Sequence, residues 1–135
     1  PIALRALPGV GAYTAGAVAS FAYEKRAALV DTNVARVLQR VFAPQLHPKS
    51  GPGLKQLWLI AEQLLPRTGK ATWTHNQALM ELGALVCTAR VPRCGICPVT
   101  ADCATFPQLE AAAALAATAD APPTRKGKRR SAATG

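Results

Sequence analysis

The sequence has few aromatic residues, few acidic residues and no long hydrophobic run. Aromatic residues make up 5% of the chain, and 7 Asp or Glu stand against 16 Lys or Arg, a net charge of +9. No apolar stretch reaches the roughly 18 residues that a transmembrane helix needs, and no basic start precedes an apolar core as in a signal peptide. These absences argue against membrane insertion and secretion, and the charge indicates a polyanionic partner.

The positive charge is not confined to the C-terminal end. Residues 1–107 contain 11 basic and 5 acidic side chains, a net of +6, and residues 108–135 contain 5 and 2, a net of +3. Because the larger part is basic by itself, nucleic acid is the leading candidate partner. The 135 residues suit one domain or part of one, and a chain that begins with Pro1 instead of Met fits a fragment or a processed protein.

Hydrophobic periodicity predicts helices almost throughout and no β-strand, so the expected fold class is all-α. Helices are expected over 12–22, from Asp31 onward, over 54–65, over 73–86 and, more weakly, over 109–119. Loops rich in Pro and Gly are expected at 44–53 and 66–71, and residues 121–135 have the composition of a disordered basic tail. The side chains expected in the core are Val34, Val37, Leu38 and Val41 in one helix and Leu79, Leu82, Leu85 and Val86 in another.

Four cysteines fall close together at Cys87, Cys94, Cys97 and Cys103, a C-x6-C-x2-C-x5-C pattern. Two disulfides are one interpretation, but nothing indicates an oxidising compartment. A metal site with four thiolate ligands is favoured. Structural zinc usually takes two closely spaced pairs, whereas the uneven spacing suits a loop around a 4Fe–4S cluster; the residues alone leave both metals open.

Two arginines lie between the first two cysteines, Arg90 and Arg93. Their ordinary role is to keep a loop surface hydrated. In a basic protein, they are equally candidates for contacts with phosphate.

The segment Leu7-Pro8-Gly9-Val10-Gly11 predicts a tight turn that leads directly into a helix. Glycines allow positive φ and a close approach of the backbone, and the unpaired N–H groups of a helix start can hold an anion. An ordinary turn between helices capped by glycine is the alternative. Asp31, before Thr32 and Asn33, is typical of a plain helix N-cap; a catalytic role requires that it also face a cleft.

Taken together, these motifs resemble the helix–hairpin–helix DNA glycosylase superfamily. The resemblance rests on LPGVGAYTA at 7–15, on VDTNVARV at 30–37 and on the four-cysteine loop, in that order, and it covers roughly residues 1–107. The segment NQALMELGA at 76–84, which leads into Cys87, makes the adenine DNA glycosylases of the MutY type the most similar group. The implied organisation is a helical region over 1–86, an iron–sulfur loop over 87–107, and an Ala-rich segment with a basic tail over 108–135.

The resemblance implies a role for each motif. The turn grips a DNA phosphate, with Leu7, Gly9, Val10, Gly11 and Thr14 as its contacts and Arg90 and Arg93 as further DNA contacts. Asp31 is the catalytic aspartate that stabilises an oxocarbenium-like sugar, Asn33 helps to hold that site, and the target base is turned out of the duplex. Cys87, Cys94, Cys97 and Cys103 are the ligands of a 4Fe–4S cluster.

Tyr13 separates two related chemistries. Endonuclease III-type relatives carry a lysine at this position, whose amine forms a Schiff base with the sugar. A tyrosine cannot do so, which favours a glycosylase without lyase activity and places Tyr13 near the sugar. The alternative role for Tyr13 is packing beneath the turn.

Two features of the family are not found in this sequence. The glutamate that protonates the adenine lies well before the hairpin in the family, so the chain alone is expected to be nearly inactive. Members of the family usually carry a C-terminal domain that reads 8-oxoguanine, whereas this chain runs into the Ala-rich segment and the basic tail.

The sequence therefore predicts a base-excision-repair enzyme that removes adenine mispaired with guanine or 8-oxoguanine in double-stranded DNA. It is expected to be a cytoplasmic, nucleoid-associated monomer. An endonuclease III-like glycosylase/lyase and a non-catalytic DNA-binding iron–sulfur module are the alternatives, and a zinc-loop protein is a weaker one.

Overall fold

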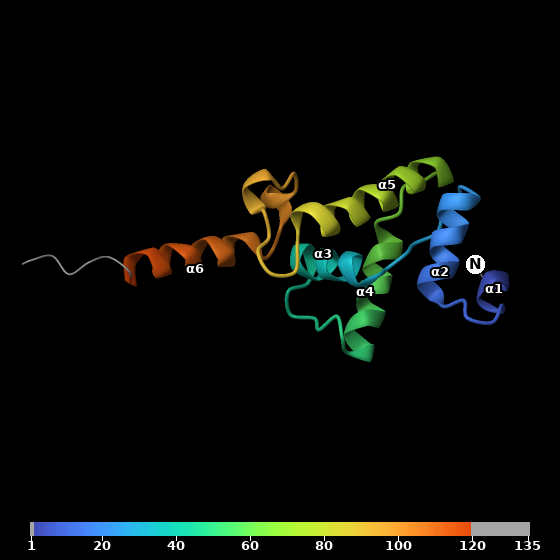
Figure 1. Cartoon of the computed structure of the whole chain (residues 1–135), viewed down its shortest axis with the longest axis horizontal. Helices are drawn as coiled ribbons and strands as arrows, with labels where there is room; N and C mark the ends of the chain where they lie inside the picture. Colours follow the sequence, from blue (N-terminus) through green and yellow to red (C-terminus); the bar gives the residue numbers. More distant parts are fainter. Residues whose placement is uncertain (1, 120–135) are drawn as a thin grey trace, which may run out of the picture.

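The computed structural model describes residues 2–119, and every regular element in that range is helical (Figure 1). The α-helices are α1 (Ile2–Arg5), α2 (Ala12–Ala17), α3 (Thr32–Phe42), α4 (Gly51–Gln63), α5 (Gly69–Glu81) and α6 (Phe106–Ala119). Two π-helical turns, η1 (Val18–Ala22) and η2 (Leu82–Val86), extend α2 and α5, and two short 3₁₀ turns, η3 (Cys94–Ile96) and η4 (Thr100–Asp102), lie in the cysteine loop. The expectation of an all-α fold is confirmed.

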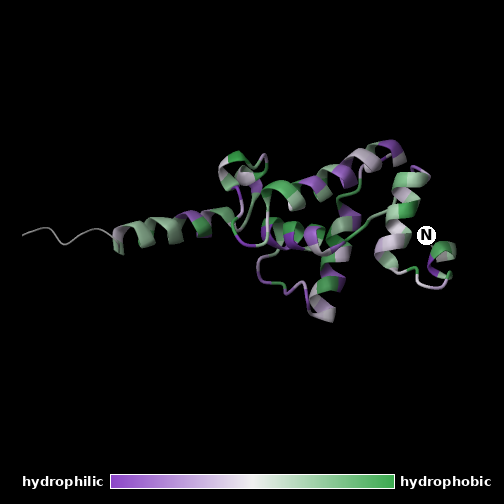
Figure 2. Ribbon diagram, in the orientation of Figure 1, coloured by the Kyte–Doolittle hydropathy of each residue, from purple (hydrophilic) through white to green (hydrophobic). Residues whose placement is uncertain are grey.

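The core forms where α3 packs against α4, α5 and η2, and Ala17 and Phe21 pack against the same cluster of buried side chains. Val34, Val37, Leu38 and Val41 are buried, as the periodicity of this helix predicts, and Leu57 of α4 is fully buried beside them. Figure 2 shows hydrophobic and hydrophilic residues alternating along α3, as an amphipathic helix requires. This helix therefore lies at the centre of the core.

Two helices begin earlier than the sequence suggests. The loops expected over 44–53 and 66–71 end at Ser50 and Thr68, whose hydroxyl groups accept hydrogen bonds from the N–H groups of Gly53 (3.0 Å) and Ala71 (3.1 Å). A hydroxyl cap supplies the partner that the first turn lacks, and proline is tolerated there because it needs no donor. These two loop predictions were wrong at their C-terminal ends.

Leu85 was also predicted wrongly. It was expected in the core, but 63% of it is exposed. The helix changes to π-helical geometry over Leu82–Val86, and a π turn holds more residues than an α turn, so the apolar face shifts around the axis. Leu79, Leu82 and Val86 remain half-buried.

A buried polar contact joins α5 to two positions that lie 56 and 49 residues earlier in the sequence. The Asn76 amide on α5 donates to Ser20 Oγ and to the carbonyl oxygen of Ala27, both at 2.9 Å. Nearby, a Cβ on Gly16 would lie 2.1 Å from the carbonyl oxygen of Ala28, so only glycine allows α2 to pack this closely. Both features fix the extended segment that leads to Asp31.

The C-terminal helix stands apart from the body. It covers the expected 109–119 helix and begins earlier, at Phe106, and none of its residues is buried. Figure 1 shows α6 extending away from the other helices. The predicted tail over 121–135 lies outside the described residues, and no helix within the described range is long and apolar enough to cross a membrane.

Candidate functional site

The turn over 7–11 has the backbone that its glycines predict. Gly9 adopts a φ of +77°, in the left-handed region that glycine favours, and the N–H of Val10 donates to the carbonyl oxygen of Leu7 at 3.2 Å. Gly11 is the N-cap of α2 and contributes no side chain to the cap. Within residues 2–119, no carbonyl accepts from the N–H groups of Gly9 or Gly11, so both donors are available to a ligand.

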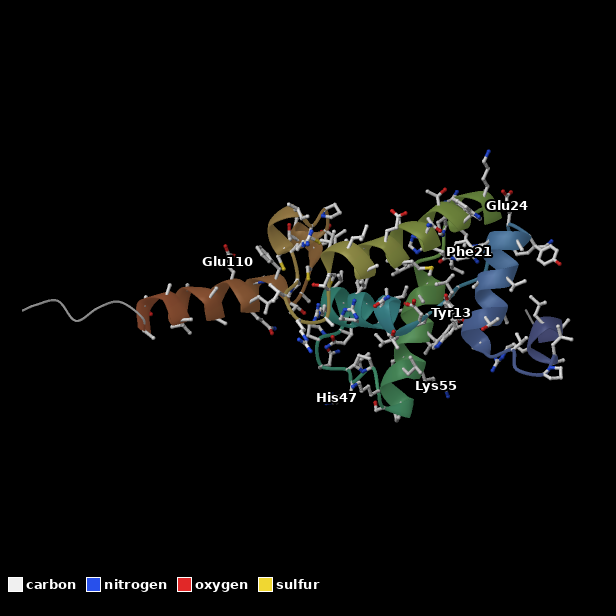
Figure 3. All side chains as sticks on the ribbon, in the orientation of Figure 1. Tyr13, Phe21, Glu24, His47, Lys55 and Glu110 are labelled. Carbon is white, nitrogen blue, oxygen red and sulfur yellow. The ribbon has the colours of Figure 1, made fainter. Side chains whose placement is uncertain are left out.

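The first turn of α2 places two polar side chains beside this loop. Tyr13 and Thr14 are both exposed, Tyr13 by 36%. In Figure 3, Tyr13 leaves α2 on the side where α3 and α4 are drawn. Hydroxyl groups on this turn can complement the backbone donors of residues 9–11.

Asp31 is the N-cap of α3. Its Oδ1 accepts from the N–H of Val34 at 2.7 Å, and the residue is half-buried after the buried pair Leu29 and Val30. In the described part of the chain, nothing donates to Oδ2. The helix N-terminus favours a negative charge at this place, so Asp31 presents a fixed carboxylate with one oxygen still available.

Asn33 connects this end of α3 to the cysteine loop through Arg36. Its Oδ1 accepts from Arg36 Nη2 at 3.1 Å. The same guanidinium donates to the carbonyl oxygens of Gly83 (2.6 Å) and Cys87 (2.9 Å). Asp31, Asn33 and the main chain of Cys87 are thus all joined to α3, which is about 16 Å long at 1.5 Å per residue.

The four cysteines surround one small cavity. Cys87, Cys94, Cys97 and Cys103 are half-buried free thiols that line a space of about 30 Å³, together with apolar side chains such as Val37 and Leu82. Loss of solvent, and then the charges of the other three cysteines, raise the pKa of Cys94, while Arg40 opposes this rise. Four such sulfurs can ionise together only if a positive charge joins them.

The donor set of this cavity is four thiols from one loop. All four thiols face the same space. A 4Fe–4S cluster takes one thiolate at each iron. The donor set therefore fits a 4Fe–4S cluster.

Arg90 and Arg93 lie on the exposed surface of the cysteine loop. The main-chain N–H of Arg93 donates to the carbonyl oxygen of Val86 at 2.8 Å, which ties the loop to the end of η2. Both side chains are accessible to a partner on this surface.

Arg36 and Arg40 are the residues that the sequence analysis missed. They lie four residues apart on α3, so they share one face of the helix, and both donate to the loop that begins at Cys87. The only signal in the sequence was this pair of cations in a helix with an apolar stripe.

Comparison with known proteins finds that the chain is similar to DNA glycosylases. It is 48% identical over 104 residues to the adenine DNA glycosylase of Homo sapiens, covering 77% of this chain and 19% of that protein. It is 52% identical over 98 residues to the adenine DNA glycosylase of Mycolicibacterium smegmatis, covering 72% of this chain and 32% of that protein. No protein-family model matches the chain.

A solved structure supports the same relationship. The chain superimposes on a thermostable thymine-DNA glycosylase with a TM-score of 0.69 and 36% identity, covering 79% of this chain and 48% of that one. The chain spans between 16% and 32% of the length of the curated relatives it matches.

Proposed function

Since the chain belongs to the helix–hairpin–helix DNA glycosylases of the MutY type, we propose that it forms part of an adenine DNA glycosylase of base-excision repair. The enzyme hydrolyses the N-glycosidic bond of adenine mispaired with guanine or 8-oxoguanine. Its substrate is double-stranded DNA, and it acts as a monomer at the nucleoid of the cytoplasm. The relatives named above and the net charge of +9 support DNA as the partner.

The observation that carries this proposal is the geometry of Asp31. One oxygen of its carboxylate is fixed by the N–H of Val34, and the other has no donor within the described residues. As the bond between C1′ and the adenine breaks, positive charge develops on the sugar. A fixed carboxylate stabilises that charge in the transition state more than in the ground state, which is what lowers the barrier.

The turn over 7–11 supplies the grip on the DNA backbone. The N–H groups of Gly9 and Gly11 face no partner among residues 2–119, and phosphate oxygens are their natural acceptors. Thr14, Arg90 and Arg93 add exposed polar contacts. These contacts fix the register of the duplex while the adenine is turned out of the stack.

Cys87, Cys94, Cys97 and Cys103 are proposed to hold a 4Fe–4S cluster. Bound in this loop, the cluster supplies a structural cross-link between four thiolates. Its contribution here is to shape the surface that carries Arg90 and Arg93. Iron analysis of the purified chain tests the assignment, and zinc in place of iron contradicts it.

The catalytic role is tested by Asp31→Asn in a full-length glycosylase that carries this segment. Asparagine caps a helix about as well as aspartate, so folding is retained, whereas adenine release slows by about 10²- to 10³-fold because the charge is lost. Single-turnover release from an A·8-oxoG duplex measures this loss, and binding to the same duplex is the control. Unchanged turnover would refute the assignment.

Tyr13 provides a second test, because it decides between hydrolysis and lyase chemistry. A hydroxyl group cannot form the Schiff base that a lysine amine forms with an opened sugar. Borohydride treatment on DNA with an abasic site is therefore expected to trap no covalent adduct. A trapped adduct would favour a glycosylase/lyase that acts by another amine.

A further inference from the structure

We propose that Arg40 is a positioning residue for the cysteine loop, holding both ends of the loop to α3 and directing an N–H group at the sulfur of Cys87. The first part stands on the described contacts alone. The second part rests on the proposed metal site, because it concerns a sulfur that would be a ligand.

The start of the loop is held by the guanidinium of Arg40. Nη1 donates to the carbonyl oxygen of Thr88 at 2.7 Å and to Cys87 Sγ at 3.4 Å, and Nη2 donates to the carbonyl oxygen of Ala89 at 3.0 Å. Three successive residues are therefore bound by one planar group. A guanidinium can do this because its donors are fixed in a rigid fork.

The end of the loop is held by the backbone of the same residue. The carbonyl oxygen of Arg40 accepts from the N–H of Thr105 at 3.2 Å and also from the Thr105 hydroxyl. The next carbonyl, that of Val41, accepts from the N–H of Ala104 at 2.9 Å. The last turn of a helix leaves such carbonyl oxygens without partners in the helix. Here Ala104 and Thr105 of the loop supply the missing donors.

The electrostatics of this place favour an arginine. The C-terminal end of α3 carries partial negative charge, and four cysteines lie close to it. Thiolate ligands are stabilised by a nearby cation and by an N–H donor, and groups outside the ligand set commonly change metal affinity by about 10- to 100-fold. Arg40 provides the charge, the donor and the anchoring of the loop together.

The Cys103 contact distinguishes the metal-free chain from the loaded one. Its thiol donates to the Arg40 carbonyl oxygen at 3.6 Å. A thiolate ligand has no proton to donate, so this contact is lost on metal binding. The Thr105 contacts then remain to hold this end of the loop.

Three variants test the proposal in the chain loaded with iron and sulfide. Arg40→Gln removes the charge and the fork, Arg40→Lys keeps the charge alone, and Thr105→Val removes one hydroxyl contact at the other end. Loss of the cluster to a chelator is monitored by the visible absorbance of the cluster. It is expected to be about tenfold faster in Arg40→Gln than in the unmodified chain. Arg40→Lys should fall between Arg40→Gln and the unmodified chain.

The reduction potential separates a positioning role from general support of the fold. Removing a cation and a donor beside a ligand sulfur disfavours the more negatively charged state of the cluster. The potential of Arg40→Gln is therefore expected to fall, and Arg40→Lys should recover part of it. Arg90→Gln is the matched control, because it removes one charge from the same loop, and the Arg90 side chain makes no hydrogen bond within residues 2–119; it should retain the cluster.

Trypsin cleavage of the metal-free chain tests the anchoring of the loop independently of the cluster. Trypsin can cleave within the loop after Arg90 and Arg93, and cleavage should accelerate in Arg40→Gln and in Thr105→Val because one end of the loop is released. If the unmodified chain takes up no iron, the cluster assignment fails, while the cleavage rates still test the anchoring. Cluster loss and cleavage at the unmodified rate in Arg40→Gln would overturn the proposal, as would an equally fast loss of the cluster in Arg90→Gln.

Discussion

Both ends of α3 carry polar groups at a helix terminus, but the two ends differ in how many of these groups have hydrogen-bond partners within the protein. At the N-terminal end, Asp31 commits one carboxylate oxygen to the cap and leaves the other without a donor in the described range. At the C-terminal end, the carbonyl oxygens of Arg40 and Val41 and the guanidinium of Arg40 all have partners in the cysteine loop.

This difference supports the proposal that the N-terminal end of α3 is the end that meets the DNA. A group with all its hydrogen bonds made inside the protein holds the structure in place, since a new partner would have to displace an old one. A fixed group with an open position is prepared for a ligand and needs little reorganisation to bind it. Thus α3 works as a rigid connection between an open site and a closed one.

The largest effect is expected from breaking the connection at Arg36, which contacts both ends. Arg36→Gln removes hydrogen bonds to Asn33, Gly83 and the carbonyl oxygen of Cys87, and the free energy of unfolding should fall by about 3 kcal/mol. Urea denaturation measures the change. Arg67→Gln, on the exposed loop between α4 and α5, is the control and should stay close to the unmodified protein; an equal loss there would contradict the connection.

A smaller effect should sharpen the comparison at the N-terminal end. Asp31→Ala removes the cap and should lower the free energy of unfolding by about 1 kcal/mol, whereas Asp31→Asn should leave it nearly unchanged. Thermal unfolding of the two variants side by side gives the difference. If both variants are destabilised equally, the charge at Asp31 contributes to folding. That result would contradict the view that this end of α3 is kept open for a ligand.

The smallest effect concerns pH and the C-terminal half of α3. His75 lines an apolar groove with Val37 and Val41, and burial lowers its pKa below the ordinary value of 6.5. The unfolded chain therefore binds a proton more readily, and this contribution to stability is present above pH 6.5 and is lost as the pH falls below it. His75→Gln should flatten that acid-side decline in denaturation curves; an unchanged decline assigns it to other groups.

The sequence could predict those parts of the fold and site that depend on neighbouring residues. The turn at Gly9, the cap at Asp31 and the buried stripe of α3 all follow from local rules, and the structure confirms each of them. Helix starts at Ser50 and Thr68 also obey a local rule, but the surrounding prolines and glycines in the sequence obscured it.

What the sequence could not predict depends on contacts between distant residues. Arg40 and Thr105 are 65 positions apart, and Arg36 and Cys87 are 51 apart; no periodicity or spacing connects them. The prediction that Leu85 is buried was wrong for a related reason, because a π-helical turn changed which face of α5 points inward.

The sequence by itself thus determined an all-helical, basic chain with a glycine turn, a capping aspartate and four clustered cysteines. Only the tertiary structure decided that α3 joins Asp31 to the cysteine loop, with one end open and the other closed. The physical reason is that local backbone preferences set where helices begin and end. Which hydrogen-bonding groups remain available depends on every segment that folds back against them.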